Sequence, residues 1–136
     1  MWVRDEIRRV ASKGVQELSE SDTKDLFERV EKAFARNGRT PLWERLTASA
    51  GRQNAYGWRE IGRFVDGALI LLVDDPQGHC AFRFDTAAAL QGVLEETSGF
   101  EFYATDDALT FLLAFNHHDF VIGAGRAEAW IRSLPE

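Results

Sequence analysis

The sequence has few residues that could cross-link or anchor the chain. It contains one cysteine, Cys80, among 136 residues, so an internal disulfide is excluded and we expect a reducing, cytoplasmic environment. Its longest strongly apolar run, Ala68–Val73, is far shorter than the roughly 20 residues that cross a bilayer. Charged residues are spread through the N-terminal region, which predicts no signal peptide and no membrane partner.

Basic charge is also scarce. The 16 basic residues stand against 22 acidic ones and give a formal net charge of −6. This balance disfavours a nucleic-acid binder, because such proteins neutralise phosphates with lysine and arginine. An acidic surface would instead steer a basic protein partner toward the chain, although the same charge also serves solubility.

The residues that are abundant are those of a folded protein. Hydrophobic residues make up 45% of the sequence and charged residues 28%, and ten residues are phenylalanine. The length predicts one domain spanning residues 1–136, which would bury about two-thirds of its unfolded surface. Such a domain needs neither a disulfide nor a metal to fold.

Residues 1–40 predict a pair of amphipathic helices. An apolar stripe from Val3 to Leu18, interrupted by Gly14, indicates the first helix. Residues 26–34 carry a cleaner helical stripe, and Ser19 is placed to cap this second helix.

Residues 41–136 predict the sheet-containing part. Ala68–Val73 is expected to be a strand buried on both faces, and His79–Phe84 alternates as a strand should. Further strands are expected at 61–65, 100–104, 109–115 and 120–124, with a hairpin turn at Asp66-Gly67 and a loop over 50–56. Helices are expected at 40–48, after a cap at Asp85 or Thr86, and around Trp130. The sequence therefore predicts an α+β domain with an N-terminal helical pair, a five- or six-stranded mainly antiparallel sheet and a closing C-terminal helix.

Two of the three histidines lie in Asn116-His117-His118-Asp119, between two apolar runs. Four polar residues at this place are typical of a hairpin turn in which Asn116 and Asp119 bond to backbone amides. Imidazole and carboxylate groups are also metal ligands, and the same side chains would suit a partner contact. Because neighbours on a strand face opposite sides, His117 and His118 meet on one ion only if the turn breaks that alternation. We therefore favour the structural turn and expect no metal.

Arg83, Glu101 and Tyr103 lie on the polar faces of predicted strands. If those strands are neighbours, the three side chains form a patch suited to a protein partner, and otherwise they belong to a solvated sheet face or to one tied to the N-terminal helices. Trp43 and Trp58 flank the expected loop over 50–56. They are candidates for lining a groove, and the alternative is that they pack in the core.

Motifs of known catalysis are missing from the sequence. It has no P-loop, dinucleotide fingerprint, nucleophile elbow or zinc-finger spacing. Cys80 lies beside His79, but it shares its strand face with Phe82 and Phe84, which predicts a buried, inert thiol. Neighbouring carboxylates such as Asp74-Asp75 fall in expected turns or helix ends. We therefore expect no catalytic residues and no cofactor.

The succession of elements over residues 58–134 resembles a group of small, functionally uncharacterised bacterial proteins with an Asn-His-His-Asp hairpin. The likeness is carried by Trp58-x-x-Ile61, the long apolar strand, Val93-Leu94-Glu95-Glu96, Phe100-Glu101-Phe102-Tyr103, Asn116-His117-His118-Asp119, Gly123-x-Gly125 and Trp130. Helices ahead of an antiparallel sheet, with a terminal Trp-bearing helix, are also similar to the SUKH superfamily of bacterial immunity proteins. That family opens on Leu-Pro-x-x-Tyr, where this chain has Thr40-Pro41-Leu42-Trp43. The resemblance implies an α+β domain that neutralises a secreted toxin by binding it.

Taken with the acidic charge, these features favour a non-enzymatic cytosolic binding protein, either a toxin-neutralising immunity protein or another interaction module, whose partner is a protein such as a basic toxin domain. Its expected contact residues are Trp43, Trp58, Arg83, Glu101, Tyr103, Asn116, His117, His118 and Asp119. The alternative is a small metal-dependent hydrolase or nuclease-like enzyme that uses His117, His118 and Asp119. A third hypothesis is an assembly component whose N-terminal helices pack against another copy.

Overall fold

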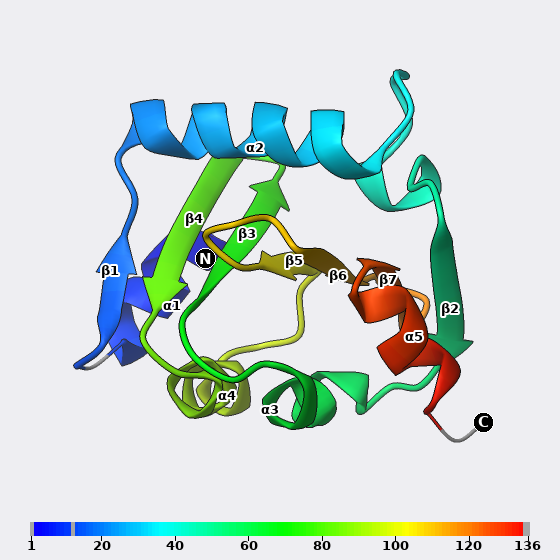
Figure 1. Cartoon of the computed structure of the whole chain (residues 1–136). Helices are drawn as coiled ribbons and strands as arrows, with labels where there is room; N and C mark the ends of the chain where they lie inside the picture. Colours follow the sequence, from blue (N-terminus) through cyan, green and yellow to red (C-terminus); the bar gives the residue numbers. More distant parts are fainter. Residues whose placement is uncertain (1, 12, 135–136) are drawn as a thin grey trace.

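Seven strands form one open antiparallel sheet in the computed structural model, which describes residues 2–11 and 13–134. Across the sheet, the order is β1 (Val15–Glu17), β4 (Gly78–Phe84), β3 (Leu69–Asp75), β5 (Phe102–Thr105), β6 (Phe111–Phe115), β7 (Phe120–Gly125) and β2 (Ser49–Gln53). The two edges are therefore β1 and β2 (Figure 1).

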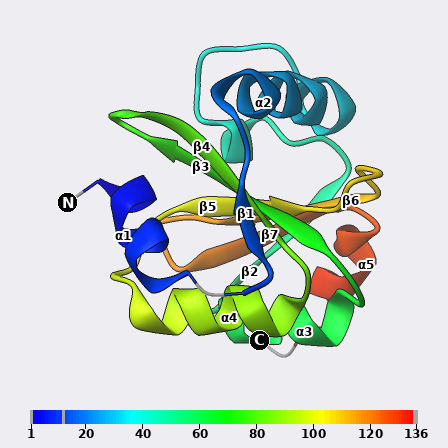
Figure 2. The ribbon, with the colours of Figure 1, turned by 90° about the vertical axis from the view of Figure 1, so that its left-hand side faces the viewer.

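Helices cover both faces of this sheet. The long helix α2 (Glu20–Phe34) lies over one face, while α1 (Val3–Val10), α3 (Ile61–Phe64), α4 (Ala87–Glu96) and α5 (Ala127–Arg132) lie on the other (Figures 1 and 2). The sheet consequently separates two hydrophobic cores, one beneath α2 and a larger one on the opposite face. None of the helices within residues 2–11 and 13–134 is long and apolar enough to span a bilayer.

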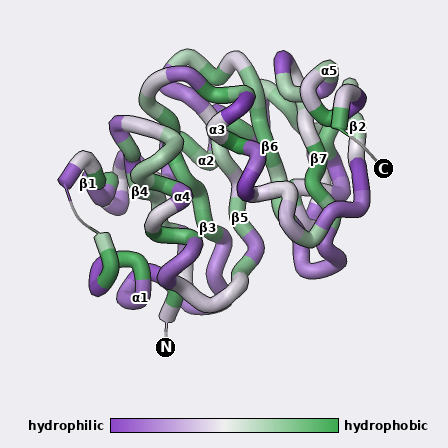
Figure 3. The backbone as a smooth tube through the Cα atoms, turned by 90° about the horizontal axis from the view of Figure 1, so that it is seen from below, coloured by the Kyte–Doolittle hydropathy of each residue, from purple (hydrophilic) through white to green (hydrophobic). Residues whose placement is uncertain are grey.

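The alternation of side chains in β3 explains how both cores form. Leu69, Leu71 and Val73 point into the larger core, and Ile70 and Leu72 point toward α2. The first five residues of β3, Leu69–Val73, have no solvent face, which is why they are all apolar, whereas the strand ends on the exposed Asp74 and the half-buried Asp75. Hydrophobic residues follow the central strands and hydrophilic residues follow the turns at the rim (Figure 3).

The α+β class, the N-terminal helices, the antiparallel sheet and the C-terminal helix agree with the sequence-based expectation. Ser19 and Thr86 cap their helices by accepting hydrogen bonds from the amides of Asp22 and Ala89. The turn at residues 116–119 joins β6 to β7 as predicted. The number of strands was underestimated, since the sheet has seven.

Two sequence-based predictions that the structure contradicts concern short edge strands. Residues 15–17 belong to β1 instead of a first helix that reaches Leu18, because Gly14, at φ +81°, turns the chain so that it pairs with β4. Residues 49–53 form β2 instead of a loop, held by pairing with β7. Neither segment shows alternation in its sequence, because each is fixed by a partner distant in the chain.

Two further errors concern helices. Residues 61–65 begin with helix α3 and are not a strand, so Asp66-Gly67 joins no hairpin there. Ile61 and Val65 are four residues apart, and this spacing places them on one face in either conformation. The helix expected at 40–48 is only a 3-10 turn, η1 (Leu42–Glu44), with Pro41 at its N-cap in place of Thr40.

Candidate functional site

The turn between β6 and β7 is tightly organised by its first residue. The Asn116 side-chain oxygen accepts hydrogen bonds from the amides of His118, at 2.9 Å, and Phe120, at 3.2 Å. Asp119 takes a left-handed conformation, with φ +60°, which aspartate tolerates better than most residues. The predicted role of Asn116 is thus confirmed. The predicted side-chain bond of Asp119 is absent among the described residues, where only its backbone carbonyl accepts, from the amide of Asn54.

The turn also breaks the strand alternation, so the two imidazoles do not diverge. The ring centroids of His117 and His118 are 3.8 Å apart. The backbone amide of His117 donates to a Glu101 carboxylate oxygen at 2.8 Å, and the His117 ring nitrogen Nδ1 contacts the same oxygen. The Trp43 ring lies edge-on to both imidazoles, at 6.2 and 6.0 Å between centroids. We call Trp43, Glu101, His117 and His118 the His–Trp cluster.

Tyr103 holds the backbone of Trp43, and so one side of the His–Trp cluster, in place. Its hydroxyl accepts a hydrogen bond from the backbone amide of Trp43 at 3.2 Å, and its side chain is only 5% exposed, in the core beneath α2. Burial raises the pKa of the phenol well above its ordinary value, so the hydroxyl stays protonated. Of the alternatives left open for Tyr103, the structure has the face that is tied to the N-terminal helices, because α2 and η1 cover it, so Tyr103 does not lie in an exposed patch.

Arg83 lies apart from Glu101 and Tyr103. Its guanidinium pairs with the carboxylates of Asp107, at 3.0 Å, and Asp85, at 3.4 Å. In the sheet register Arg83 is level with Thr105, four residues along the chain from Glu101, which corresponds to roughly 13 Å in a strand. The three residues share one face of the sheet but do not form one patch.

A pocket of about 710 Å³ opens beside the turn, and Glu101 and His117 of the His–Trp cluster line part of it. Its walls come from the end of α4, the 3-10 helix η2 (Gly57–Glu60) and the strands flanking the turn, and its lining includes Trp58, Glu95, Glu101, Phe115, Asp119 and Phe120. We call it the aromatic pocket. Trp58 therefore does line a pocket, whereas Trp43 does not line it and lies against the imidazoles in the His–Trp cluster.

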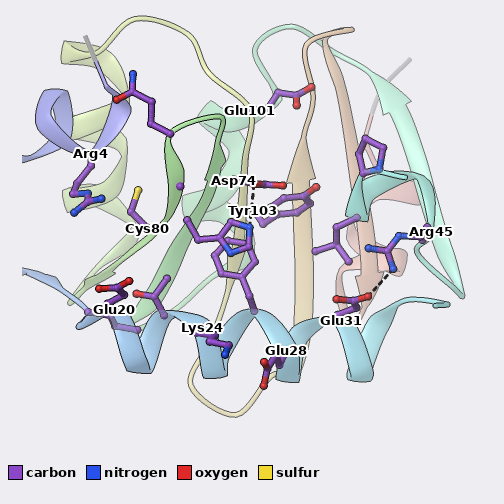
Figure 4. Close-up of a pocket in the computed structure, with 18 of the residues that line it drawn as sticks. Arg4, Glu20, Lys24, Glu28, Glu31, Arg45, Asp74, Cys80, Glu101 and Tyr103 are labelled. Carbon is purple, nitrogen blue, oxygen red and sulfur yellow. Dashed lines mark hydrogen bonds and ion pairs between the residues drawn. The ribbon is translucent and has the colours of Figure 1, made fainter. Parts of the chain in front are cut away.

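A larger groove, of about 910 Å³, runs between α2 and the sheet (Figure 4). Several of its charged groups are paired with each other: Glu31 with Arg45 at 2.9 Å, and Asp74 with His79 at 3.0 Å. Other charged side chains of its lining, among them Arg4, Glu20, Lys24, Glu28 and Arg39, form no ion pair among the described residues, and they carry both signs of charge. Glu101 lines both this groove and the aromatic pocket, so the two hollows meet at the His–Trp cluster.

Cys80 is not equipped to act as a nucleophile. Its side chain is 3% exposed, and burial raises the pKa of the thiol to about 11. The expectation that the Cys80 thiol is buried is confirmed. His79, its neighbour, points to the opposite face and stacks on Phe27, with ring centroids 4.0 Å apart.

Alkaline pH should destabilise the chain partly through Cys80. Since the thiol has an ordinary pKa of 9.0 and a folded-state pKa of about 11, the unfolded chain loses this proton first as the pH rises. The stabilising contribution is complete below the lower value and is lost through this window, at about 1.4 kcal/mol per pH unit. Urea unfolding at increasing pH should show a steeper loss for the natural chain than for Cys80→Ala. Equal slopes would contradict a buried thiol.

The described residues around the turn do not have the arrangement that a metal site needs. Within residues 2–11 and 13–134, no three side chains of His, Cys, Asp or Glu come together as a metal site requires. The metal-dependent hydrolase therefore stays a prediction without an observation that favours it.

Sequence reasoning missed three contributors near the turn. Phe120 and Phe115 were read only as strand residues, and Glu95 only as part of a helix end. The one signal that the sequence offers is the position of Phe120 directly after the polar turn. A buried carboxylate was also missed: Glu6 accepts from the Ser98 amide and hydroxyl and joins α1 to the end of α4.

No protein-family model matches this sequence, and comparisons with curated proteins and with solved structures gave no match. The resemblances to the small bacterial proteins and to the SUKH superfamily therefore stay predictions.

Proposed function

We propose that this chain is a non-enzymatic protein-binding module whose partner docks around the β6–β7 turn. The observation that carries the proposal is the convergence of three other chain segments, at Trp43, Trp58 and Glu101, on one turn, where exposed imidazole and phenyl groups lie close to half-buried indole rings. Aromatic side chains on a supported surface are the usual anchors of protein interfaces.

The support beneath these side chains favours binding. Asn116 fixes the turn through two backbone amides, and Tyr103 fixes the backbone of Trp43. Groups that are already held in place lose less conformational freedom when a partner arrives. The surface is therefore suited to recognition without rearrangement.

The charge of the surface favours a basic partner. Glu95, Glu101 and Asp119 lie around the turn, in a chain with a formal net charge of −6. Complementary charge steers association and raises its rate. A basic toxin domain neutralised by this acidic chain is the partner class we propose, consistent with the immunity-protein resemblance.

The His117–Glu101 pair is the arrangement closest to a catalytic one. An imidazole oriented by a carboxylate serves as a general base when a nucleophile or substrate group is within reach. Among the described residues, no serine, threonine or cysteine side chain hydrogen-bonds to either turn histidine, and Cys80 is buried elsewhere. We therefore assign the pair to partner contact.

Removal of both turn imidazoles should abolish partner capture. The immobilised chain is incubated with lysate of its source cells, and retained proteins are compared for the natural chain, His117→Ala/His118→Ala and the control His79→Ala, which alters an imidazole in the groove under α2. The first variant should retain at least about tenfold less of the partner, because interface anchors are commonly worth more than 1 kcal/mol. The control should retain it fully.

Circular dichroism spectra of both variants should match that of the natural chain, since the turn imidazoles are exposed. Equal retention by the double variant, or loss of the partner in His79→Ala alone, would place the docking surface elsewhere.

A further inference from the structure

The two large apolar side chains that are exposed among the described residues both lie beside the aromatic pocket. Phe120 is 38% exposed and lines it, and Tyr56, 61% exposed, immediately precedes η2 in its wall. Exposed apolar groups around a hollow mark a site that is covered in a complex. The pocket thus offers aromatic surface to an occupant.

The rim of the pocket is negatively charged. Glu95, Glu101 and Asp119 all line it, and the carboxylates of Glu95 and Asp119 have no ion-pair partner among the described residues. The C-terminal end of α4 adds to this charge, because a helix carries partial negative charge at that end. The last turn of α4 has no basic residue and contains Glu95 and Glu96, which oppose the helix dipole. A cation at this place would relieve that unfavourable arrangement.

The pocket already shows how a guanidinium group packs on its wall. The Arg59 guanidinium lies over the rings of Tyr56, at 4.7 Å, and Trp58, at 5.1 Å. Both distances are within the range of cation–π attraction. Arg59 is exposed and forms no ion pair with Glu95 or Asp119, so these two carboxylates remain available to a second cation, while Glu101 is paired with His117.

We propose that the aromatic pocket receives an arginine side chain of the protein partner. Its guanidinium would pair with Glu95 and Asp119 and pack on the exposed phenyl ring of Phe120. Arginine suits this place better than lysine, because its planar group stacks on aromatic rings and forms paired bonds with carboxylates. The inference rests on the proposed function and names the chemistry that the partner brings to the turn.

Three short peptides test the inference by nuclear magnetic resonance. Acetyl-Gly-Arg-Gly-amide, its lysine counterpart and its citrulline counterpart, which has the shape of arginine without the charge, are titrated into isotope-labelled chain. The arginine peptide should shift the Trp58 indole and Phe120 amide signals in a saturable manner. Lysine should bind more weakly, and citrulline should cause no shift.

Charge-removing variants complete the test. Glu95→Gln/Asp119→Asn should weaken binding of the arginine peptide at least about fivefold, and asparagine tolerates the left-handed backbone at position 119. The control Asp25→Asn/Asp66→Asn removes the same charge from exposed positions elsewhere and should change binding less than about twofold. Equal weakening by both variants, equal shifts with citrulline, or no shift with arginine would overturn the inference.

Failure of this inference can be told apart from failure of the proposed function. If the arginine peptide does not bind while the partner is still lost from His117→Ala/His118→Ala, the turn remains the docking surface and only the arginine assignment falls. If the peptide binds as expected but His117→Ala/His118→Ala retains the partner as fully as the control His79→Ala does, the pocket recognises arginine and the docking proposal falls.

Discussion

Replacement of Gly123 by alanine should destabilise the chain by about 3 kcal/mol, since overpacking at a close backbone contact is among the costly single changes. A Cβ atom at Gly123 would lie 2.5 Å from the carbonyl oxygen of Ala127 and 2.6 Å from the Cγ1 atom of Ile131. Both contacts are with α5, so the substitution must push this helix off β7. Urea unfolding followed by circular dichroism measures the loss.

Gly92 supplies the matched control. It lies in α4, and an added Cβ there would meet nothing within 4 Å. Gly92→Ala should therefore leave the chain unchanged or stabilise it by up to about 1 kcal/mol, the helix preference of alanine over glycine. A Gly123→Ala chain as stable as the natural one would show that α5 does not pack as closely as described.

Truncation of Leu71 and truncation of Leu72 should each cost about 2–5 kcal/mol, the usual range for a buried leucine. The two side chains are both fully buried, at 0% exposure, but they point into different cores. In a sheet with one face in water, one of two consecutive leucines would be exposed, and its truncation would cost little. Equal large effects follow only when helices cover both faces.

The measurement is the free energy of unfolding of Leu71→Ala, Leu72→Ala and the exposed control Asp74→Ala on the same strand. The control should change stability by less than about 1 kcal/mol. A small effect of Leu72→Ala beside a large effect of Leu71→Ala would mean that α2 does not cover the sheet.

Segments with a strong local pattern were predictable from the sequence. The buried part of β3, Leu69–Val73, is continuously apolar, β4 alternates, and the caps of α2 and α4 are ordinary capping residues. In these segments the local preference and the final packing agree, so the sequence alone is sufficient.

Segments fixed by distant partners were not predictable. β2 pairs with β7, about seventy residues away, and contains Gly51 and Arg52, which give no strand signal. The apolar pair Ile61 and Val65 fits both a helix and a strand, and only the packing of α3 against α4 decides between them. Long-range contacts of this kind leave no periodicity in one sequence.

The candidate site also has a part that was predictable from local sequence and a part that depends on distant contacts. Asn116, His117 and His118 were predictable as a group, because they are neighbours in a recognisable turn. The contact of Trp43 with the two imidazoles, and the hydrogen bond from its amide to Tyr103, join segments about sixty or more residues apart and depend on the fold. Arg83 was included because it shares a sheet face with Glu101, but face alone does not specify position along the strand.

Hydrogen exchange of the chain, with and without the captured partner, tests most directly whether the β6–β7 turn is the docking surface. Exchange should slow at residues 42–44, 54–59, 94–101 and 116–120, which surround the turn, and should stay unchanged on the exposed side of α3 and α5. Slowed exchange on α3 and α5 with an unaffected turn would contradict the account.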